Sequence, residues 1–313
     1  ALNVMPLFHI GGMQFVLMTM KFGIPYLMMK SFDPAAMLAA IGDVELGITN
    51  IGGVPAMWSA MSLAPEIENT DLSRIRVAAT GAESVPEPML KDWQQRGILL
   101  QEVYGMTEAG GVICMAQKAD LPEHMGYAGR ALPYGELKVM TSETQEANSG
   151  ELGEIWMRGA SVTPGYWNRP DATAETIVDG WLRSGDIGRV DEDGFVYVED
   201  RVKDMILRAG ENVYGAEVES AIYEHPAVHE AAVFGVPHER LGEEVAVAIY
   251  PNDHTTLTAE ELWEFLEGKI SKHKIPTHVV IINEPLPRNA AGKFLKRDLQ
   301  QQVVKGVLVP TSR

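Results

Sequence analysis

The sequence predicts a large α/β domain followed by a small C-terminal α+β domain. Residues 1 to about 130 alternate strand-like and helix-like segments, which is typical of a layered α/β domain. From Gly135 to Val198 the pattern changes to short strands separated by turn signals, and beyond Arg201 a compact unit of about 110 residues follows. A chain of 313 residues, 46% of them hydrophobic, is long enough to bury a core in each of two domains. We place the boundary between residues 202 and 203.

The first twenty residues contain no charged side chain. Pro6, Gly11, Gly12 and Gln14 interrupt this apolar run, so we expect a buried strand, loop and helix of a soluble domain rather than a membrane span. No basic stretch and no small-residue cleavage site indicate a signal peptide. Because the chain begins inside apolar sequence without methionine, we expect that an N-terminal portion is missing.

Within the first domain, a strand, a helix and a second strand follow one another. Residues 74–79 read as a strand that runs into Gly81. Pro86 is suited to the first turn of a helix, and Gly97 marks its end. Residues 98–103 read as the next strand. Its carboxyl end delivers Tyr104 to the sheet edge where open α/β sheets bind ligands.

The later segments carry turn and capping signals. Residues 187–190 and 195–198 flank the turn 191–194, which predicts a β-hairpin. Thr258 and Glu261 predict a capping box at the start of a helix. The apolar stripe of that helix is predicted to comprise Leu262, Phe265, Leu266 and Ile270.

Composition excludes several classes of protein. A net charge of −17 and a pI near 4.9 argue against a nucleic-acid binder. A single cysteine, Cys114, excludes an intramolecular disulfide and a Cys-rich zinc site, and it suits a reducing cytoplasm. His225 and His229 have helical spacing but flank Pro226, so we expect no transition-metal site there. We therefore expect a soluble cytoplasmic protein with no integral membrane segment.

Four short motifs occur in a characteristic order: residues 104–108 (YGMTE), 184–186 (SGD), 200–204 (DRVKD) and 289–293 (NAAGK). At these residues the chain resembles the adenylate-forming superfamily of acyl-CoA synthetases, peptide-synthetase adenylation modules and luciferases. The resemblance implies that a carboxylic acid is activated as its AMP anhydride. It also implies that the short strands after residue 135 form a small, distorted β-barrel-like subdomain.

The resemblance implies an adenine site at two neighbouring segments. Gly81, Ala82 and Glu83 match the segment that flanks adenine, where glycine lets the backbone approach a base closely. Tyr104 would stack on adenine, and Glu102 would reach its amino group.

Further residues are assigned to the ribose, the phosphates and the metal. Thr107 would donate to a phosphate oxygen, and Glu108 would hold Mg²⁺, which prefers oxygen ligands shared with substrate phosphates. Asp186 would accept hydrogen bonds from both ribose hydroxyls. Arg201 would reach the ribose and phosphate, and Val198 is a further candidate nucleotide contact.

The C-terminal domain supplies the predicted catalytic lysine. Lys293 would follow the charge that develops when the carboxylate attacks the α-phosphate, as a catalytic group together with Thr107 and Glu108. Lys203 occupies the hinge position of the superfamily, about which the small domain swings between the two half-reactions. The predicted CoA face comprises Gly210, Glu211 and Asn212.

The segment 6–12 (PLFHIGG) resembles the acid-pocket motif of the superfamily. The predicted acyl pocket comprises His9, Ile10, Gly11, Gly105 and Met106. Nine of the 16 methionines lie before residue 62. Flexible thioethers suit an adaptable fatty-acyl pocket, although such methionines are also common in ordinary cores.

Together these observations predict an AMP-forming acyl-CoA synthetase that uses ATP, Mg²⁺ and coenzyme A. A medium- or long-chain fatty acid is the expected substrate, and an aryl acid such as a cinnamate is the next candidate. A peptide-synthetase adenylation domain, a luciferase-like oxidation and a non-catalytic AMP-binding fragment remain alternatives. The sequence has no Ser/Thr/Gly-rich phosphate loop before the acid-pocket motif, so we expect binding of AMP but impaired use of ATP. A homodimer is possible, and the sequence does not decide the oligomeric state.

Overall fold

The computed structural model describes residues 1–252, 255–289 and 292–313. The chain divides into two compact units, Ala1–Val198 and Glu199–Arg313, and each is described by itself. The first unit is α/β with two sheets, and the second is a smaller α+β unit, which confirms the predicted fold class. The predicted domain boundary lies a few residues after the observed division and stays a prediction.

The first sheet of unit 1 has the strand order β2-β1-β3-β4-β5-β6-β7. The strands from β2 to β5 pair in parallel, and β5–β6 and β6–β7 pair antiparallel. The elements are β1 (Leu2–Asn3), α1 (Ile10–Phe22), β2 (Leu27–Met28), α2 (Pro34–Gly42), β3 (Asn50–Gly53), α3 (Pro55–Leu63), the 3₁₀ turn η1 (Pro65–Asn69), β4 (Val77–Gly81), α4 (Glu87–Gln95), β5 (Gln101–Met106), the 3₁₀ turn η2 (Thr107–Ala109), β6 (Gly111–Met115) and β7 (Arg130–Ala131).

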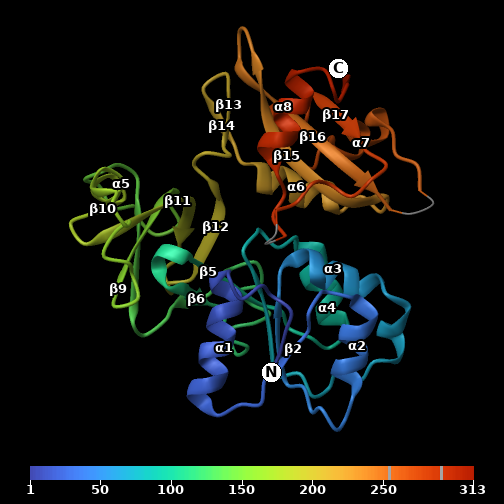
Figure 1. Ribbon diagram of the computed structural model, residues 1–313. Helices are drawn as coiled ribbons and strands as arrows, with labels where there is room; N and C mark the ends of the chain where they lie inside the picture. The colour runs from blue at the N-terminus through green and yellow to red at the C-terminus, as the bar shows by residue number, and fades with distance from the viewer. Residues whose placement is uncertain (253–254, 290–291) are drawn as a thin grey trace. The chain divides into compact units, whose positions relative to one another are not determined.

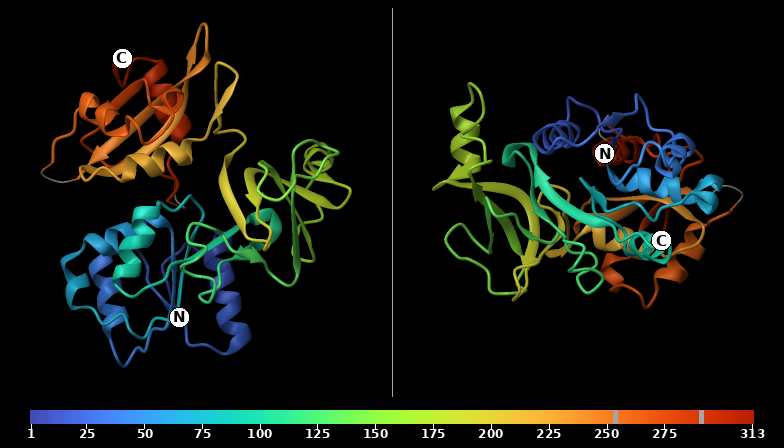
Figure 2. Two further views of the ribbon diagram at one scale, coloured as in Figure 1. Left: turned by 180° about the vertical axis from the view of Figure 1, so that it is seen from behind. Right: turned by 90° about the horizontal axis from the view of Figure 1, so that it is seen from below.

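Helices cover both faces of this sheet. Helices α2, α3 and α4 lie on one side and α1 lies on the other (Figures 1 and 2). Apolar side chains of α2, α3 and α4 pack with those of β1 and β3 in one buried cluster. At its centre Trp58 and Trp93 meet edge to face, with ring centroids 5.0 Å apart, an arrangement that aromatic rings favour.

The second sheet of unit 1 follows in sequence. Its strand order is β10-β11-β9-β8, and β12 pairs with β11. The predicted hairpin therefore forms, from the end of β11 and the start of β12. The elements are β8 (Gly135–Met140), β9 (Gly153–Gly159), α5 (Pro170–Thr176), β10 (Ile177–Val178), β11 (Trp181–Val190) and β12 (Val196–Arg201), the last of which runs into unit 2.

Unit 2 is built around a sheet of order β14-β13-β16-β17-β18, with β15 paired to β16. Helices α6 and α7 pack with one set of its apolar residues, and α8 packs with another. The elements are β13 (Ile206–Arg208), β14 (Glu211–Val213), α6 (Gly215–Tyr223), β15 (Val228–His238), β16 (Gly242–Pro251), α7 (Ala259–Leu266), the 3₁₀ turn η3 (Lys272–Lys274), β17 (His278–Ile281), α8 (Lys296–Val304) and β18 (Thr311–Ser312).

The capping box of α7 is confirmed, but the predicted length of this helix is wrong. Thr258 accepts from the Glu261 N–H, and the Glu261 carboxylate accepts from the Thr258 N–H at 2.9 Å. The helix ends at Leu266, so Ile270 lies outside it. Gly268 has φ +80°, a left-handed conformation that ends helices and that glycine adopts without strain.

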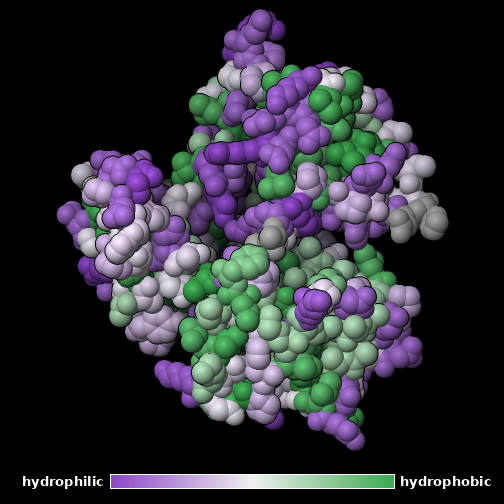
Figure 3. Space-filling model, in the orientation of Figure 1, coloured by the Kyte–Doolittle hydropathy of each residue, from purple (hydrophilic) through white to green (hydrophobic). Residues whose placement is uncertain are grey.

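The first helix is less buried than predicted. Met13, Leu17 and Met20 follow one another at helical spacing, and their exposed fractions are 42%, 56% and 74%. Met18 and Phe22 are exposed beside them. We call these five residues the outer face of α1, and Figure 3 shows hydrophobic side chains gathered in this part of the surface. Apolar patterning indicates a helix, but it does not say what covers each side.

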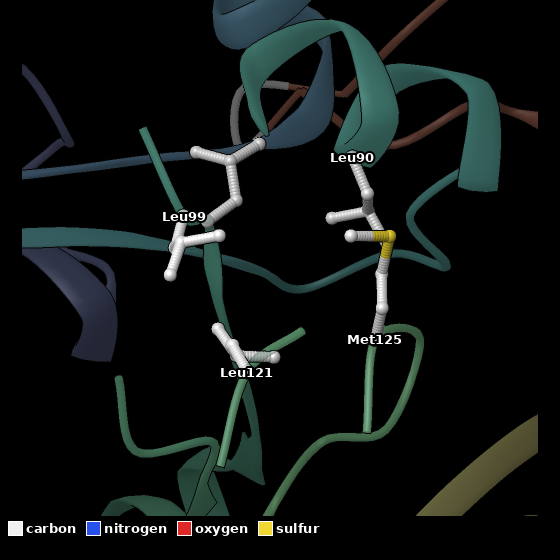
Figure 4. Close-up of a pocket in the computed structure, with 5 residues that line it drawn as sticks. Leu90, Leu99, Leu121 and Met125 are labelled. Atoms are coloured by element: carbon white, nitrogen blue, oxygen red, sulfur yellow. The ribbon is translucent and has the colours of Figure 1, made fainter. Parts of the chain in front are cut away.

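Three further features concern the interior and the surface of the fold. A small apolar cavity lies between α4, the start of β5 and the loop after β6; Figure 4 shows the side chains that line it, including Leu90, Leu99, Leu121 and Met125. Its lining offers no polar side chain to a nucleotide. Cys114 is buried on β6 and donates to the carbonyls of Ala128 and Gly129. In the described part of the chain, no helix is long and apolar enough to span a membrane.

Candidate functional site

The turn after β4 is pressed against β5. A Cβ at Gly81 would lie 2.4 Å from the Val103 carbonyl oxygen, so only glycine fits between the two strands. Ala82 follows with φ +76°, a left-handed conformation that costs energy for a residue with a side chain. Ala82 is exposed and Glu83 is half-buried. The predicted adenine-flanking segment is therefore a close, strained turn at the carboxyl end of a parallel strand.

The tyrosine of the predicted motif lies within β5 rather than after it. Strand β5 extends through Met106, because Tyr104 pairs with Cys114 of the antiparallel neighbour β6. The Tyr104 hydroxyl donates to the Asp186 carboxylate at 2.8 Å, across 82 positions of the sequence. Burial, and then the negative charge of Asp186, raise the pKa of Tyr104 well above its usual value. Only 9% of Tyr104 is exposed, so little of its ring is open to a ligand in this structure. Its stacking on adenine stays a prediction.

A bulge in β11 orients Asp186. The pairing of β11 with β9 shifts register between Arg183 and Ile187, and such bulges re-aim side chains next to functional sites. The Gly185 N–H donates to the Glu154 carboxylate at 3.0 Å, and the Asp186 N–H donates to the Ser184 hydroxyl at 3.0 Å. The strand thus fixes the backbone around Asp186 and brings the first two motifs together.

Glu102 precedes the tyrosine on β5. Burial raises the pKa of its carboxyl to about 8, and the N–H of Gly126 opposes this rise by donating to it. Near neutral pH the folded protein therefore holds Glu102 mainly as a neutral acid, with one donor and one acceptor.

Thr107 and Glu108 form the short 3₁₀ turn η2. The Glu108 carboxylate accepts from the Tyr166 hydroxyl at 2.9 Å, and the Glu108 carbonyl accepts from the Thr163 N–H at 2.7 Å. Burial, and then the contact with Glu108, raise the pKa of Tyr166. Sequence reasoning missed Tyr166. The sequence shows there only an aromatic residue after a Pro-Gly turn, which does not indicate a contact with Glu108.

The predicted magnesium ligand, Glu108, does not belong to a larger group of possible metal ligands in the described part of the chain. No group of three or more His, Cys, Asp and Glu side chains is placed there to hold a metal ion. Mg²⁺ often binds through one or two carboxylates together with substrate phosphates, and the single carboxylate of Glu108 fits that mode.

The predicted acyl residues come from two neighbouring elements. His9 caps α1, and its Nδ1 accepts from the Gly11 N–H at 3.2 Å. The Gln14 carboxamide of α1 accepts from the Val112 N–H of β6 at 3.1 Å, and Val112 pairs with Gly105 of β5. The structure thus ties the helix that carries His9, Ile10 and Gly11 to the strand pair that carries Gly105 and Met106.

The methionines do not form one pocket. Met13, Met18 and Met20 lie on the outer face of α1, whereas Met37 and Met61 are fully buried in the core. The methionine count therefore gives no support to a fatty-acyl pocket.

Unit 1 ends at Val198 on β12, and the third motif follows Glu199 at the start of unit 2. The Arg201 N–H donates to the Asp200 carboxylate at 2.7 Å, which also accepts from the Gly215 N–H at the start of α6 at 2.5 Å. Lys203 is exposed in the turn that follows β12. Its hinge role, and the nucleotide contacts of Val198 and Arg201, stay predictions.

The predicted CoA residues lie in a tight hairpin turn. Ala209 and Gly210 have φ +54° and +86° between β13 and β14, and successive positive φ values suit a two-residue hairpin. Glu211 pairs with Arg208 and lies 3.3 Å from His273, and Asn212 pairs with Leu207. The positive φ that the hairpin turn requires is enough to explain a glycine at position 210. Contact of these residues with CoA stays a prediction.

Lys293 lies in the loop that leads to α8. Its N–H donates to the Asn289 side-chain oxygen at 3.0 Å, and its side chain is half-buried. Ala290 and Ala291, which belong to the fourth motif, lie outside the described residues.

Comparison with known proteins identifies the family. The chain belongs to the family of AMP-binding enzymes: residues 1–167 match its main domain, and residues 217–293 match the AMP-binding enzyme C-terminal domain. The predicted resemblance to the adenylate-forming superfamily is thereby confirmed.

The chain is similar to ligases that act on different acids. It is 36% identical to an indoleacetate–CoA ligase of Aromatoleum aromaticum, over 97% of this chain and 59% of that protein. It is 34% identical to a long-chain-fatty-acid–CoA ligase of Mycobacterium tuberculosis, over 95% of this chain and 58% of that protein. The chain thus spans about 60% of the length of these relatives.

A solved structure shares the fold. The o-succinylbenzoate CoA synthetase of Bacillus subtilis, in complex with an acyl-adenylate intermediate, superposes with a TM-score of 0.85 at 32% identity, over 96% of this chain and 60% of that one. The same enzyme is also known in complex with ATP and a magnesium ion.

Proposed function

We propose that the protein is an AMP-forming acid–CoA ligase. The observation that carries this proposal is the 2.8 Å hydrogen bond between Tyr104 and Asp186, which unites two nucleotide motifs in one unit of a chain of the AMP-binding family. In the proposed reaction the carboxylate attacks the α-phosphate of ATP, and pyrophosphate leaves. The CoA thiol then attacks the acyl carbon, and AMP leaves.

The nucleotide site we propose uses the carboxyl ends of β4 and β5. The strained turn at Ala82 presents backbone to the base, and Glu102, as a neutral acid, can donate to one nitrogen of the adenine edge and accept from its amino group. Asp186 would accept from the ribose hydroxyls. The Tyr104 hydroxyl supports this role by donating to Asp186.

Glu108 is proposed to hold Mg²⁺, which would neutralise charge on the phosphates. The Tyr166 hydroxyl orients the Glu108 carboxylate through its hydrogen bond, and Thr107 is exposed at the start of the same turn. Orientation of a metal-binding carboxylate by a second group is common in metal sites.

Unit 2 is proposed to supply the positive charge and the CoA contacts. Lys293 would stabilise charge on the α-phosphate as the carboxylate attacks, and Arg201 would contact the ribose and phosphate. Rotation about Lys203 would then exchange Lys293 for the hairpin turn at Gly210 before thioester formation.

The acid is proposed to have an apolar body. A medium- or long-chain fatty acid remains our first candidate, in line with the fatty-acid ligase among the relatives. An aryl acid is the second candidate, and the slightly more similar indoleacetate–CoA ligase favours it.

A panel of acids tests the proposal. Purified protein is incubated with ATP, Mg²⁺, CoA and each acid, and AMP and acyl-CoA are measured together; a second series starts from synthetic acyl-adenylates. We expect acyl-CoA from at least one apolar acid in both series. Turnover should be slower in the ATP series, because this sequence has no phosphate loop before the acid-pocket motif. Lys293→Ala should lower adenylate formation by roughly 10²–10³. An adenylation domain of a peptide synthetase would activate an amino acid without making acyl-CoA. Binding of AMP without turnover in either series would favour a non-catalytic AMP-binding protein and contradict the ligase proposal.

A further inference from the structure

One partly buried ion pair anchors the start of the loop that carries Lys293. Glu230 of β15 accepts from the Leu286 N–H at 2.7 Å and from the Arg288 guanidinium at 3.1 Å. The Arg288 and Glu230 side chains are only 20% and 13% exposed. A charge-assisted bond in such surroundings is stronger than one at the open surface, so Arg288 is held firmly against the sheet.

The same guanidinium contacts the residues on both sides of Lys293. Its Nη1 donates to the Gly292 carbonyl at 2.5 Å, and its Cζ lies 3.8 Å from the centre of the Phe294 ring. Arg288 and Phe294 also form an antiparallel β-bridge. A planar guanidinium can donate in its plane and stack on an aromatic face at once, which a lysine ammonium cannot do.

The backbone of Lys293 is tied to the next residue after Arg288. The Lys293 N–H donates to the Asn289 side-chain oxygen at 3.0 Å, and the Asn289 N–H donates to the Lys293 carbonyl at 2.9 Å. Displacement of Arg288 would therefore disturb the two neighbours of Lys293. It would also disturb Asn289, which binds the Lys293 backbone.

We propose that Arg288 is a positioning residue for Lys293: anchored by Glu230, it fixes the backbone from which the catalytic lysine reaches. The inference rests on the proposed catalytic role of Lys293. A lysine side chain has many rotamers. Fixing the backbone of Lys293 reduces the number of positions open to its ammonium group, so that less conformational entropy is lost when the group contacts the transition state.

Hydrogen–deuterium exchange tests the physical part of this proposal without any need for activity. Arg288→Gln should speed exchange in the peptide that covers residues 289–295 by about tenfold or more, because the Lys293 and Leu295 amides lose their supporting frame. Lys274→Gln is the matched control, since Lys274 forms another partly buried ion pair of unit 2, with Glu217 at 2.6 Å. Unchanged exchange at 289–295 in Arg288→Gln, or an equal increase in the control, overturns the proposal.

Kinetics of adenylate formation test the catalytic part. Arg288→Gln should lower kcat about 10- to 100-fold with little change in KM, because Lys293 acts mainly in the transition state. Arg288→Lys, which keeps the charge and is less disruptive to folding, should recover part of kcat. In a Lys293→Ala background, Arg288→Gln should have no further effect, since the two residues act as one unit. Independent, multiplicative losses would overturn the positioning role.

The two proposals fail in different ways. If the wild-type protein forms no adenylate with any acid, the proposed function fails, and the exchange measurement still decides whether Arg288 holds the loop. If the wild type is active and Arg288→Gln keeps a wild-type kcat, the proposed function stands and the inference about Arg288 is wrong.

Discussion

Replacing Glu102 by glutamine should stabilise the protein in a manner that depends on pH. Burial raises the pKa of Glu102 from an ordinary 4.5 to about 8, so the folded state binds a proton that the unfolded state has released. The wild-type protein therefore loses stability as the pH rises from 4.5 to about 8. Glutamine is neutral throughout and keeps an oxygen that can accept from the Gly126 N–H.

The size of the effect follows from the difference between the two pKa values. Each pH unit between them is worth about 1.4 kcal/mol. The advantage of Glu102→Gln in the free energy of unfolding should be close to zero at pH 4.5. It should reach about 3 kcal/mol at pH 7 and level off near 5 kcal/mol above pH 8.

Urea unfolding at pH 5, 7 and 8.5, followed by tryptophan fluorescence, measures this advantage directly. Glu123→Gln is the matched control, because Glu123 is exposed on the loop that also carries Gly126. The control should track the wild type at every pH. Parallel stability curves for Glu102→Gln and the wild type across this range would show that Glu102 is not held as a neutral acid in the folded protein.

Three further predictions follow from contacts described above. Tyr104→Phe should lower the free energy of unfolding by about 1.5–3 kcal/mol, because it removes a charge-assisted hydrogen bond to Asp186. Thermal or urea unfolding measures this loss, and a clearly smaller loss would contradict the prediction. Thr258→Ala should destabilise the protein by about 1 kcal/mol through loss of the capping box of α7, as measured by urea unfolding, whereas Thr258→Ser should retain most of that stability. Leu17 and Met20 are exposed on the outer face of α1, so changing both to glutamate should reduce whatever self-association the wild type shows in sedimentation velocity; an unchanged profile from an associating wild type would rule out this face as the contact.

Features that depend on local sequence could be predicted, and most of them are present. The capping box needs only two residues three positions apart, and the hairpin near residue 191 needs only a turn between two strands. The resemblance assigned Tyr104 and Asp186 to the same nucleotide, but nothing in the sequence predicted the hydrogen bond between them across 82 positions.

Contacts made by single side chains in loops could not be predicted. Tyr166 reaches Glu108 from an irregular loop, and Arg288 reaches Glu230 of β15 from the loop before α8, so neither belongs to a periodic pattern. The prediction extended α7 to the apolar Ile270 and did not take account of Gly268, which lies just beyond the observed end of the helix. The exposure of α1 was missed because periodicity does not distinguish a covered helix face from an open one.

The buried thiol of Cys114 has a practical consequence. Burial raises its pKa to about 12, so almost no thiolate forms at neutral pH, and the thiolate is the form that reacts with maleimides. Because Cys114 is the sole cysteine of the chain, a second cysteine placed on an exposed strand or turn should take a fluorophore or spin label selectively. Pairs of such labels, one in each unit, would report distances between the two units in solution without prior removal of the native thiol.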